Sequence, residues 1–246
     1  MEVHAHSHSH GKKNWKNYFW EFLMLFLAVF CGFFAEYQLE HQIEKDKEKQ
    51  YIHSILEDLR EDTLVLTDNI DQFNEHLTRN DTLIRLLNSP GIKDHGSDLY
   101  YLGRRASRSV RLAIHDATIQ QLKNSGGMRL IRNQKVSKAV IEYYNRLVFI
   151  DYLQAIAFNE ADEYRKMAID VFHPILFNDI VMTDNTVMRP PGNPALLTYE
   201  PKILIRLAGM VSYLRNTKLG LAKAETEMKE AARVLIGLIE KEYHLK

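Results

Sequence analysis

The sequence predicts an all-α protein in which an N-terminal transmembrane helix continues into a long heptad-bearing helix and is followed by a helical bundle. Three observations predict this class. The stretch from residue 22 to residue 35 is apolar and carries no charge. Helix-breaking residues are scarce, with 11 glycines and 6 prolines in 246 residues. Beyond the apolar stretch, apolar residues recur at alternating spacings of three and four.

The bulk composition excludes several classes of function. Lysine plus arginine and aspartate plus glutamate each number 32, so no global charge favours nucleic acid as a partner. The chain has one cysteine, Cys31, which rules out a disulfide within the chain. With 26% charged residues, a single helical domain after the apolar stretch is the simplest organisation.

Residues 17–39 are predicted to cross a membrane as one helix. The stretch 18–39 holds 22 residues. At about 1.5 Å per residue it is about 33 Å long, close to the roughly 30 Å of bilayer hydrocarbon. Amphipathic rings flank it, as is typical of membrane interfaces: Trp15, Tyr18, Trp20 and Tyr37. A cleaved signal peptide is the alternative. Cleavage after Ala35 or before Cys31 would, however, place a phenylalanine where a small residue is required, so we expect a retained anchor.

Lysines around this span favour a cytoplasmic N-terminus. Three lie just before it and three lie farther beyond it: Lys12, Lys13 and Lys16, then Lys45, Lys47 and Lys49. The positive-inside rule weights the nearer ones. Residues 1–16 are therefore predicted to be a cytoplasmic tail, and residues 40–246 an extracytoplasmic helical bundle.

Glu21 stands at the start of the span, and two roles for it are open. At about 100° per residue, Ala28, Gly32 and Ala35 fall within about 40° of it on a helical wheel. Ala28 and Gly32 have the small-xxx-small spacing that lets two membrane helices approach closely. We expect these four residues to form an oligomer face. A proton or ion pathway through Glu21 is the alternative, although no second charge follows before residue 36.

Residues 52–87 carry a heptad pattern with polar interruptions at Thr63 and Asn80. Its members are Ile52, Leu56, Leu59, Thr63, Leu66, Ile70, Phe73, Leu77, Asn80, Ile84 and Leu87. Such a stripe fits a coiled coil between subunits or the core-facing side of a helix in an intramolecular bundle. We expect the second, because other helices of similar length follow. Pro90 and Gly91 end the helix.

Further helical patterns follow, separated by loops. After a loop at 88–97, a helix is predicted from about Leu99 to Asn124. A long helix then begins at Asn133 or Ser137 and runs to about Leu176. Residues 178–201 hold four of the six prolines and are predicted to be a long loop. The stripe of the last helix consists of Leu204, Leu207, Val211, Leu214, Lys218, Leu221, Glu225, Met228, Ala232, Leu235 and Ile239.

Four histidines alternate near the N-terminus, at His4, His6, His8 and His10. Neutral imidazoles at such spacing bind Zn²⁺, Ni²⁺ or Cu²⁺. A solvated tail with incidental metal affinity and a metal-sensing tail are both open. No other cofactor is expected.

Residues 104–111 form the densest basic patch. On a helix, Arg104, Arg108 and Arg111 would share one face and would suit a phosphate, an anionic lipid headgroup or an acidic partner. Salt bridges to acidic neighbours are the expected alternative, because the overall charge is balanced.

The sequence carries no enzyme signature. A di-iron site in a helical bundle needs two Glu-x-x-His pairs, and the single pair Asp170 and His173 is the nearest approach. The chain also lacks HExxH, GxxxxGK[ST] and GxSxG. We therefore expect no enzymatic activity.

Two stretches carry a pattern of residues that also occurs in other proteins. They are EFLMLFLAVFCGFFAEYQLEH with the helix after it, and residues 117–145. The pattern falls on Glu21, Gly32, Leu59, Asp62, Leu122, Ser125, Gly126, Leu130, Ile131, Asn133, Tyr143 and Tyr144. With these residues the chain resembles a family of uncharacterised bacterial single-span membrane proteins, a domain of unknown function. The family usually has asparagines after the span, and this chain has Glu36, Tyr37 and Gln38 instead. The resemblance implies the architecture and a bacterial inner-membrane location, and it implies no activity.

Together these features predict a membrane-anchored helical scaffold or interaction protein that forms homo-oligomers and contacts the bilayer and other membrane proteins. Two alternatives are open. One is a transmembrane sensor that reports metal bound to the histidine-rich tail. The other is a channel or proton-coupled membrane component that uses Glu21.

Overall fold

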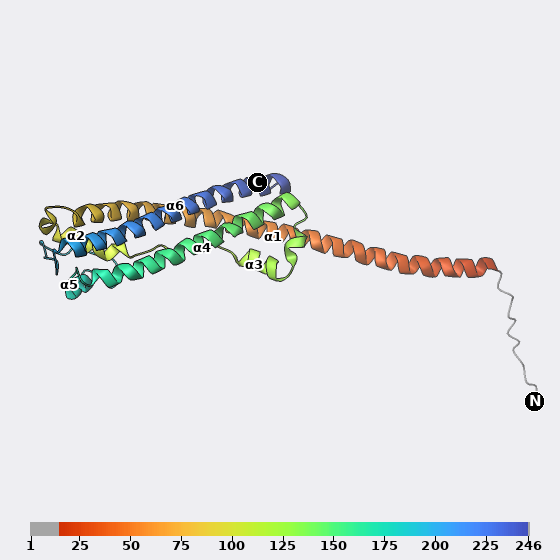
Figure 1. Cartoon of the computed structure of the whole chain (residues 1–246). Coiled ribbons are helices and arrows are strands. Elements are labelled where there is room, and N and C mark those ends of the chain that lie inside the picture. The colour runs from red at the N-terminus through yellow and green to blue at the C-terminus, as the bar shows by residue number, and fades with distance from the viewer. Residues whose placement is uncertain (1–14, 246) are drawn as a thin grey trace, which may run out of the picture. The chain divides into compact units, whose positions relative to one another are not determined.

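The protein is all-α over the residues that the structure describes, 15–245 (Figure 1). This computed structural model is 79% helical and has no β-strand in that range. The α-helices are α1 (Trp15–Leu87), α2 (Gly96–Ala106), α3 (Ala117–Asn124), α4 (Gln134–Ala168), α5 (Pro174–Asp179) and α6 (Pro201–Tyr243), and two short 3₁₀ helices are η1 (Ile92–Asp94) and η2 (Gly127–Leu130). The predicted fold class is confirmed.

Over the described residues, the chain divides into two compact units, residues 15–51 and residues 52–245. Helix α1 contributes to both. It contains an 18-residue window with a mean hydropathy of 1.9, and none of that window is buried. Among the described helices, α1 is the one that is long and apolar enough to cross a membrane.

The second unit is built on three long helices, which are the later part of α1, α4 and α6. Helices α1 and α6 run antiparallel, because Arg60 pairs with Glu240 at 2.8 Å while Asp81, farther along α1, pairs with Arg215 at 3.0 Å. Helix α4 packs along α6, as Figure 1 shows. Apolar stripes of the three helices, at the helical period, meet in a common core.

The heptad stripe of α1 faces the core of its own chain, as expected, but half of it is shifted by one residue. One row is buried as predicted: Ile52, Leu59, Leu66, Phe73, Asn80 and Leu87. The second buried row is Ile55, Asp62, Asn69, His76 and Leu83. In the row predicted instead, Leu56 is buried as predicted, whereas Thr63, Ile70, Leu77 and Ile84 are only half-buried. The prediction followed hydrophobicity alone. The helix instead buries three polar side chains, Asp62, Asn69 and His76, against residues of other elements.

The prediction of a single helix from Leu99 to Asn124 is wrong. This region contains two helices, α2 and α3, joined by an extended segment, residues 107–116, which we call the strap. Along the strap, half-buried Val110, Leu112 and Ile114 alternate with exposed residues. Alternation with period two is typical of an extended chain packed on one side, and it does not suit a helix.

Helix α4 ends at Ala168, earlier than the predicted Leu176, and the short α5 begins at Pro174. A proline has no backbone N–H to donate and disfavours helical geometry in the residue before it, so α4 does not continue through this point. The last helix begins at Pro201, where proline suits a first helical turn. All members of its predicted stripe are buried.

The loop between α5 and α6 is held against α2. The Asn193 side chain accepts a hydrogen bond from the backbone N–H of Gly96 (2.6 Å), and the Ser97 hydroxyl donates to the carbonyl of Pro190 (2.7 Å). These contacts place the loop beside the N-terminal end of α2. Farther along, Arg108, which follows the C-terminal end of α2, donates a hydrogen bond to Asn185 of the same loop.

Candidate functional site

The predicted oligomer face of the span is open on α1. Its four residues, Glu21, Ala28, Gly32 and Ala35, are all exposed. Outside its own turn of helix, no atom of the described chain lies within 4 Å of the position that a Cβ on Gly32 would occupy. Small side chains on a helix surface allow another helix to approach closely. Assembly through this face stays a prediction.

The other side of the span carries a row of stacked aromatic rings. Phe22, Phe26, Phe30 and Phe34 follow one another at 6.1 to 6.3 Å between ring centroids. On a helical wheel at about 100° per residue this row lies across the helix from Glu21. The span therefore has one face of small side chains and one of bulky rings.

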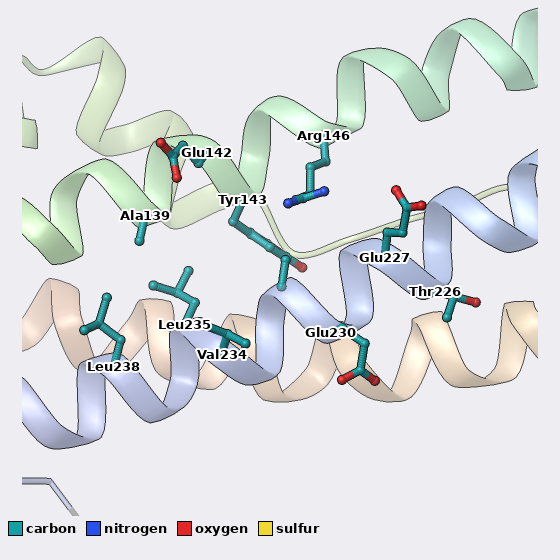
Figure 2. A pocket seen from close by; sticks show the side chains of 11 residues that line it. Ala139, Glu142, Tyr143, Arg146, Thr226, Glu227, Glu230, Val234, Leu235 and Leu238 are labelled. Atoms are coloured by element: carbon teal, nitrogen blue, oxygen red, sulfur yellow. The ribbon is translucent and has the colours of Figure 1, made fainter.

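A groove of about 600 Å³ lies between α4 and α6 in the second unit (Figure 2). Its apolar lining consists of Ala139, Tyr143, Ala231, Val234, Leu235 and Leu238. Val234 is 73% exposed and Leu235 beside it only 3%. Charged side chains border the groove, with Glu142 and Arg146 on α4 and Glu227 and Glu230 on α6. The sequence patterns did not predict this groove.

Asp62 of α1 fastens one end of the strap. Its side chain is fully buried and accepts hydrogen bonds from the backbone N–H of His115 (2.8 Å) and from the hydroxyl of Tyr143 (2.9 Å). The Nδ1 atom of His115 lies 3.1 Å from the same carboxylate. The Tyr144 hydroxyl donates to the carbonyl of His115 at 3.2 Å. Burial raises the pKa of Asp62, and the hydrogen bonds oppose that rise.

Lys218 of α6 holds the other end of the strap. It is 1% exposed, and its Nζ donates a 2.8 Å hydrogen bond to the carbonyl of Ala106, the last residue of α2. Carbonyl groups at a helix C-terminus carry partial negative charge, which favours a cation there. Burial lowers the pKa of Lys218 to about 8, and Glu160 opposes this change. Two buried side chains thus bond to the backbone near the two ends of the strap, Asp62 within it and Lys218 just before it.

Glu225 lies about two turns beyond Lys218 on the same face of α6. It is fully buried, and burial raises its pKa to about 7, while the side chain of Asn69 lowers that pKa in part. The contact with Asn69 lacks good hydrogen-bond geometry. Within the described chain, neither carboxyl oxygen of Glu225 nor the amide nitrogen of Asn69 has a hydrogen-bond partner. Burial without a partner favours the neutral carboxyl.

These side chains are among the buried polar residues of the two helices, which we call the buried polar row: Asp62, Asn69, His76 and Asn80 of α1, and Lys218 and Glu225 of α6. The sequence analysis placed Lys218 and Glu225 in a core stripe without assigning them a role. A lysine and a glutamate seven residues apart at core positions were the available signal. Asp62, Tyr143 and Tyr144 were noted only for the family resemblance, and the structure brings them together at the strap.

The basic patch is arranged differently from its prediction. Arg104, Arg108 and Arg111 do not share a helical face, because α2 ends at Ala106. Arg104 stacks over the ring of Phe177 with 5.1 Å to its centroid, and Arg108 donates to the Asn185 side chain at 2.9 Å. Arg111 is exposed in the strap. The expected salt bridges do not form within residues 15–245, where none of the three lies within 4 Å of a carboxylate.

The histidines predicted to bind metal, His4, His6, His8 and His10, lie outside the described residues. Within the described part of the chain, no group of three or more His, Cys, Asp or Glu side chains is arranged to hold a metal ion. Metal binding by the tail stays a prediction.

Comparison of the chain with protein-family models, with curated proteins and with solved structures found no match in any of the three. The resemblance to a family of single-span membrane proteins therefore stays a prediction from the sequence.

Proposed function

We propose that this chain is a membrane-anchored helical scaffold that assembles into a homo-oligomer through its span. The observation that carries the proposal is the exposure of the apolar part of α1, none of whose 18-residue window is buried. Apolar side chains around a whole helix are unfavourable in water and need lipid or other helices as neighbours. The open face of Ala28, Gly32 and Ala35 gives another helix a place to pack.

The second unit supports a structural role more than a chemical one. Two of its buried charged side chains, Asp62 and Lys218, bond to the backbone of the strap and of α2. Such contacts stabilise one arrangement of the chain, and we assign no reaction to them. The exposed groove and apolar side chains on α4, such as Val148 (72% exposed) and Tyr152 (62% exposed), are surfaces where a scaffold would meet partners.

The location we propose is the bacterial inner membrane, with the N-terminus in the cytoplasm and the bundle outside it. The lysines just before the span support this orientation. The family resemblance supports the bacterial origin.

The assembly proposal is tested with Gly32→Leu in the full chain extracted in mild detergent. A leucine at Gly32 would hold two helices apart, so we expect light scattering to show a smaller particle than for the wild type. Phe30→Leu, on the aromatic face, is the matched control and should leave the size unchanged. If the two variants and the wild type have the same particle size, the chain does not assemble through this face of the span.

Glu21→Gln separates the scaffold from the channel alternative. A scaffold should keep its size and its partners with this change, because a glutamine preserves the shape of the helix face. A loss of proton or ion flux in Glu21→Gln, with assembly intact, would favour a proton-coupled component instead.

A further inference from the structure

Four arginines come together beside Lys218, from three elements of the second unit. They are Arg79 of α1, Arg104 and Arg105 of α2, and Arg108 of the strap, and we call them the arginine cluster. The Nζ atom of Lys218 contacts the carbonyl of Ala106, which lies between Arg105 and Arg108 in the chain. His76, which is 7% exposed, is acted on by the charges of Lys218 and of three of the arginines. Burial and then the charges of Lys218, Arg79, Arg105 and Arg108 lower its pKa to about 3. Burial also lowers the pKa of Arg108, and the charges of Arg105 and Arg104 lower it further.

Few carboxylates balance this charge. Arg79 pairs with Glu75 at 2.5 Å, and Lys218 is in the field of Glu160. By contrast, Arg104, Arg105 and Arg108 have no carboxylate within 4 Å among residues 15–245. The Nε atom of Arg105 is buried and has no acceptor in the described chain. A buried donor without an acceptor, next to like charges, is unfavourable, and an anion would relieve both costs.

The guanidinium groups are also oriented. Arg104 lies over the ring of Phe177 at 5.1 Å, and Arg105 over the ring of Tyr101 at 5.5 Å. Stacking fixes the plane of a guanidinium and leaves the N–H groups at its edge available for an oxyanion. The Arg108 side chain is held by its 2.9 Å hydrogen bond to Asn185. Arginines fixed in this way lose little conformational entropy when they bind a phosphate or carboxylate.

We propose that the arginine cluster is a binding site for a phosphate-class oxyanion, with Arg105 and Arg108 as its principal ligands and Arg104 beside them. A phosphate group offers several oxygen acceptors to planar forks of donors, which a chloride ion does not. The shared chemistry is a phosphate group, and its two sources are free phosphate and the phosphodiester of an anionic lipid headgroup. The site does not depend on assembly of the span.

The site is tested on the full chain in an uncharged detergent, with inorganic phosphate as the probe and sodium chloride to keep the ionic strength constant. We expect saturable binding by calorimetry and a rise in unfolding temperature with phosphate. The double variant Arg105→Gln/Arg108→Gln should bind at least about tenfold more weakly, because it loses charge-assisted hydrogen bonds. Arg111→Gln removes an exposed arginine of the same segment and should bind as the wild type does.

A second measurement distinguishes a binding site from a merely structural cluster. Without phosphate, the double variant should unfold at a higher temperature than the wild type, because repulsion between like charges is relieved. If the double variant does not fold, Arg108→Gln alone, whose glutamine can still bond Asn185, carries the test. A variant that is destabilised without phosphate, and whose response to phosphate matches that of the wild type, overturns the proposal.

The source of the phosphate group is tested in phosphatidylcholine vesicles with and without phosphatidylglycerol. Stabilisation by phosphatidylglycerol that is lost in the double variant, with no saturable response to inorganic phosphate, supports the site with a lipid headgroup as its ligand. A saturable response to inorganic phosphate supports a soluble ligand. No saturable response of the wild type to either probe overturns the proposal.

Discussion

At the scale of single residues, the buried polar row shows how a helical bundle accommodates polar groups in its core. A buried charge is tolerated when hydrogen bonds replace the water that it loses. Asp62 meets this condition with the N–H of His115 and the hydroxyl of Tyr143, and Lys218 meets it with the carbonyl of Ala106. Glu225 does not, and its ionisation should therefore govern part of the pH dependence of stability.

We expect Glu225→Gln to stabilise the protein above pH 7 and to have little effect near pH 4.5. The folded state raises the pKa of Glu225 from 4.5 to about 7. A raised pKa contributes stability that is present below pH 4.5 and is lost as the pH rises through 7. Since each pKa unit corresponds to about 1.4 kcal/mol, the gain of the variant should reach up to roughly 3 kcal/mol.

The measurement is urea unfolding of the detergent-solubilised chain at several pH values, with the free energy of the variant compared with that of the wild type. Glu227→Gln, on the exposed side of the same turn, is the control and should give a difference close to zero throughout. A difference for Glu225→Gln that does not change with pH would show that this carboxyl does not titrate differently in the folded protein.

At the scale of elements, the strap is an extended segment that is held in a helical bundle by side chains of other elements. Val110, Leu112 and Ile114 are half-buried along it, Asp62 bonds to its His115, and Lys218 bonds to Ala106, the residue just before it. An extended segment has few backbone hydrogen bonds of its own, so its position depends on such side-chain contacts.

Asp62→Ala should lower the free energy of unfolding by about 2–4 kcal/mol, because the hydroxyl of Tyr143 and the N–H of His115 would lose their acceptor in the core. In this variant, amide hydrogen exchange should be faster at residues 110–116 than in α6. Asp71→Ala, at an exposed position of the same helix, should change the free energy of unfolding by less than about 0.5 kcal/mol. Equal stability of the two variants would show that Asp62 does not hold the strap.

The elements also show which parts of the fold the sequence could predict. Long helices were predictable, because their apolar period persists over many turns, and Pro201 marked the start of α6. The break after Ala106 was missed because basic residues and apolar residues were fitted to a helical wheel, although Val110, Leu112 and Ile114 alternate. The burial of Asp62 was not predictable from its own helix, because its partners come from the strap and from α4. The arginine cluster, like the groove, needs the same tertiary contacts.

At the scale of the whole molecule, α1 is the element that both compact units share. From residue 33 to residue 87 it contains no glycine or proline, and it continues as a helix from the apolar window to the bundle. In the proposed arrangement, one continuous helix thus contains the apolar segment in the lipid and the first long helix of the bundle. Which side of the membrane the bundle occupies decides what partners it can meet.

We expect the bundle to be outside the cytoplasmic membrane, because the lysines nearest the span precede it. Since Cys31 is the only cysteine, Cys31→Ser gives a background in which one new thiol reports one position. In intact spheroplasts, a membrane-impermeant maleimide should label Lys123→Cys, an exposed position after the span, and should label Ser7→Cys only once the membrane is permeabilised. The opposite labelling pattern would place the bundle in the cytoplasm. Labelling of both positions in intact cells would argue against a retained span, since a soluble or cleaved chain offers no barrier between them.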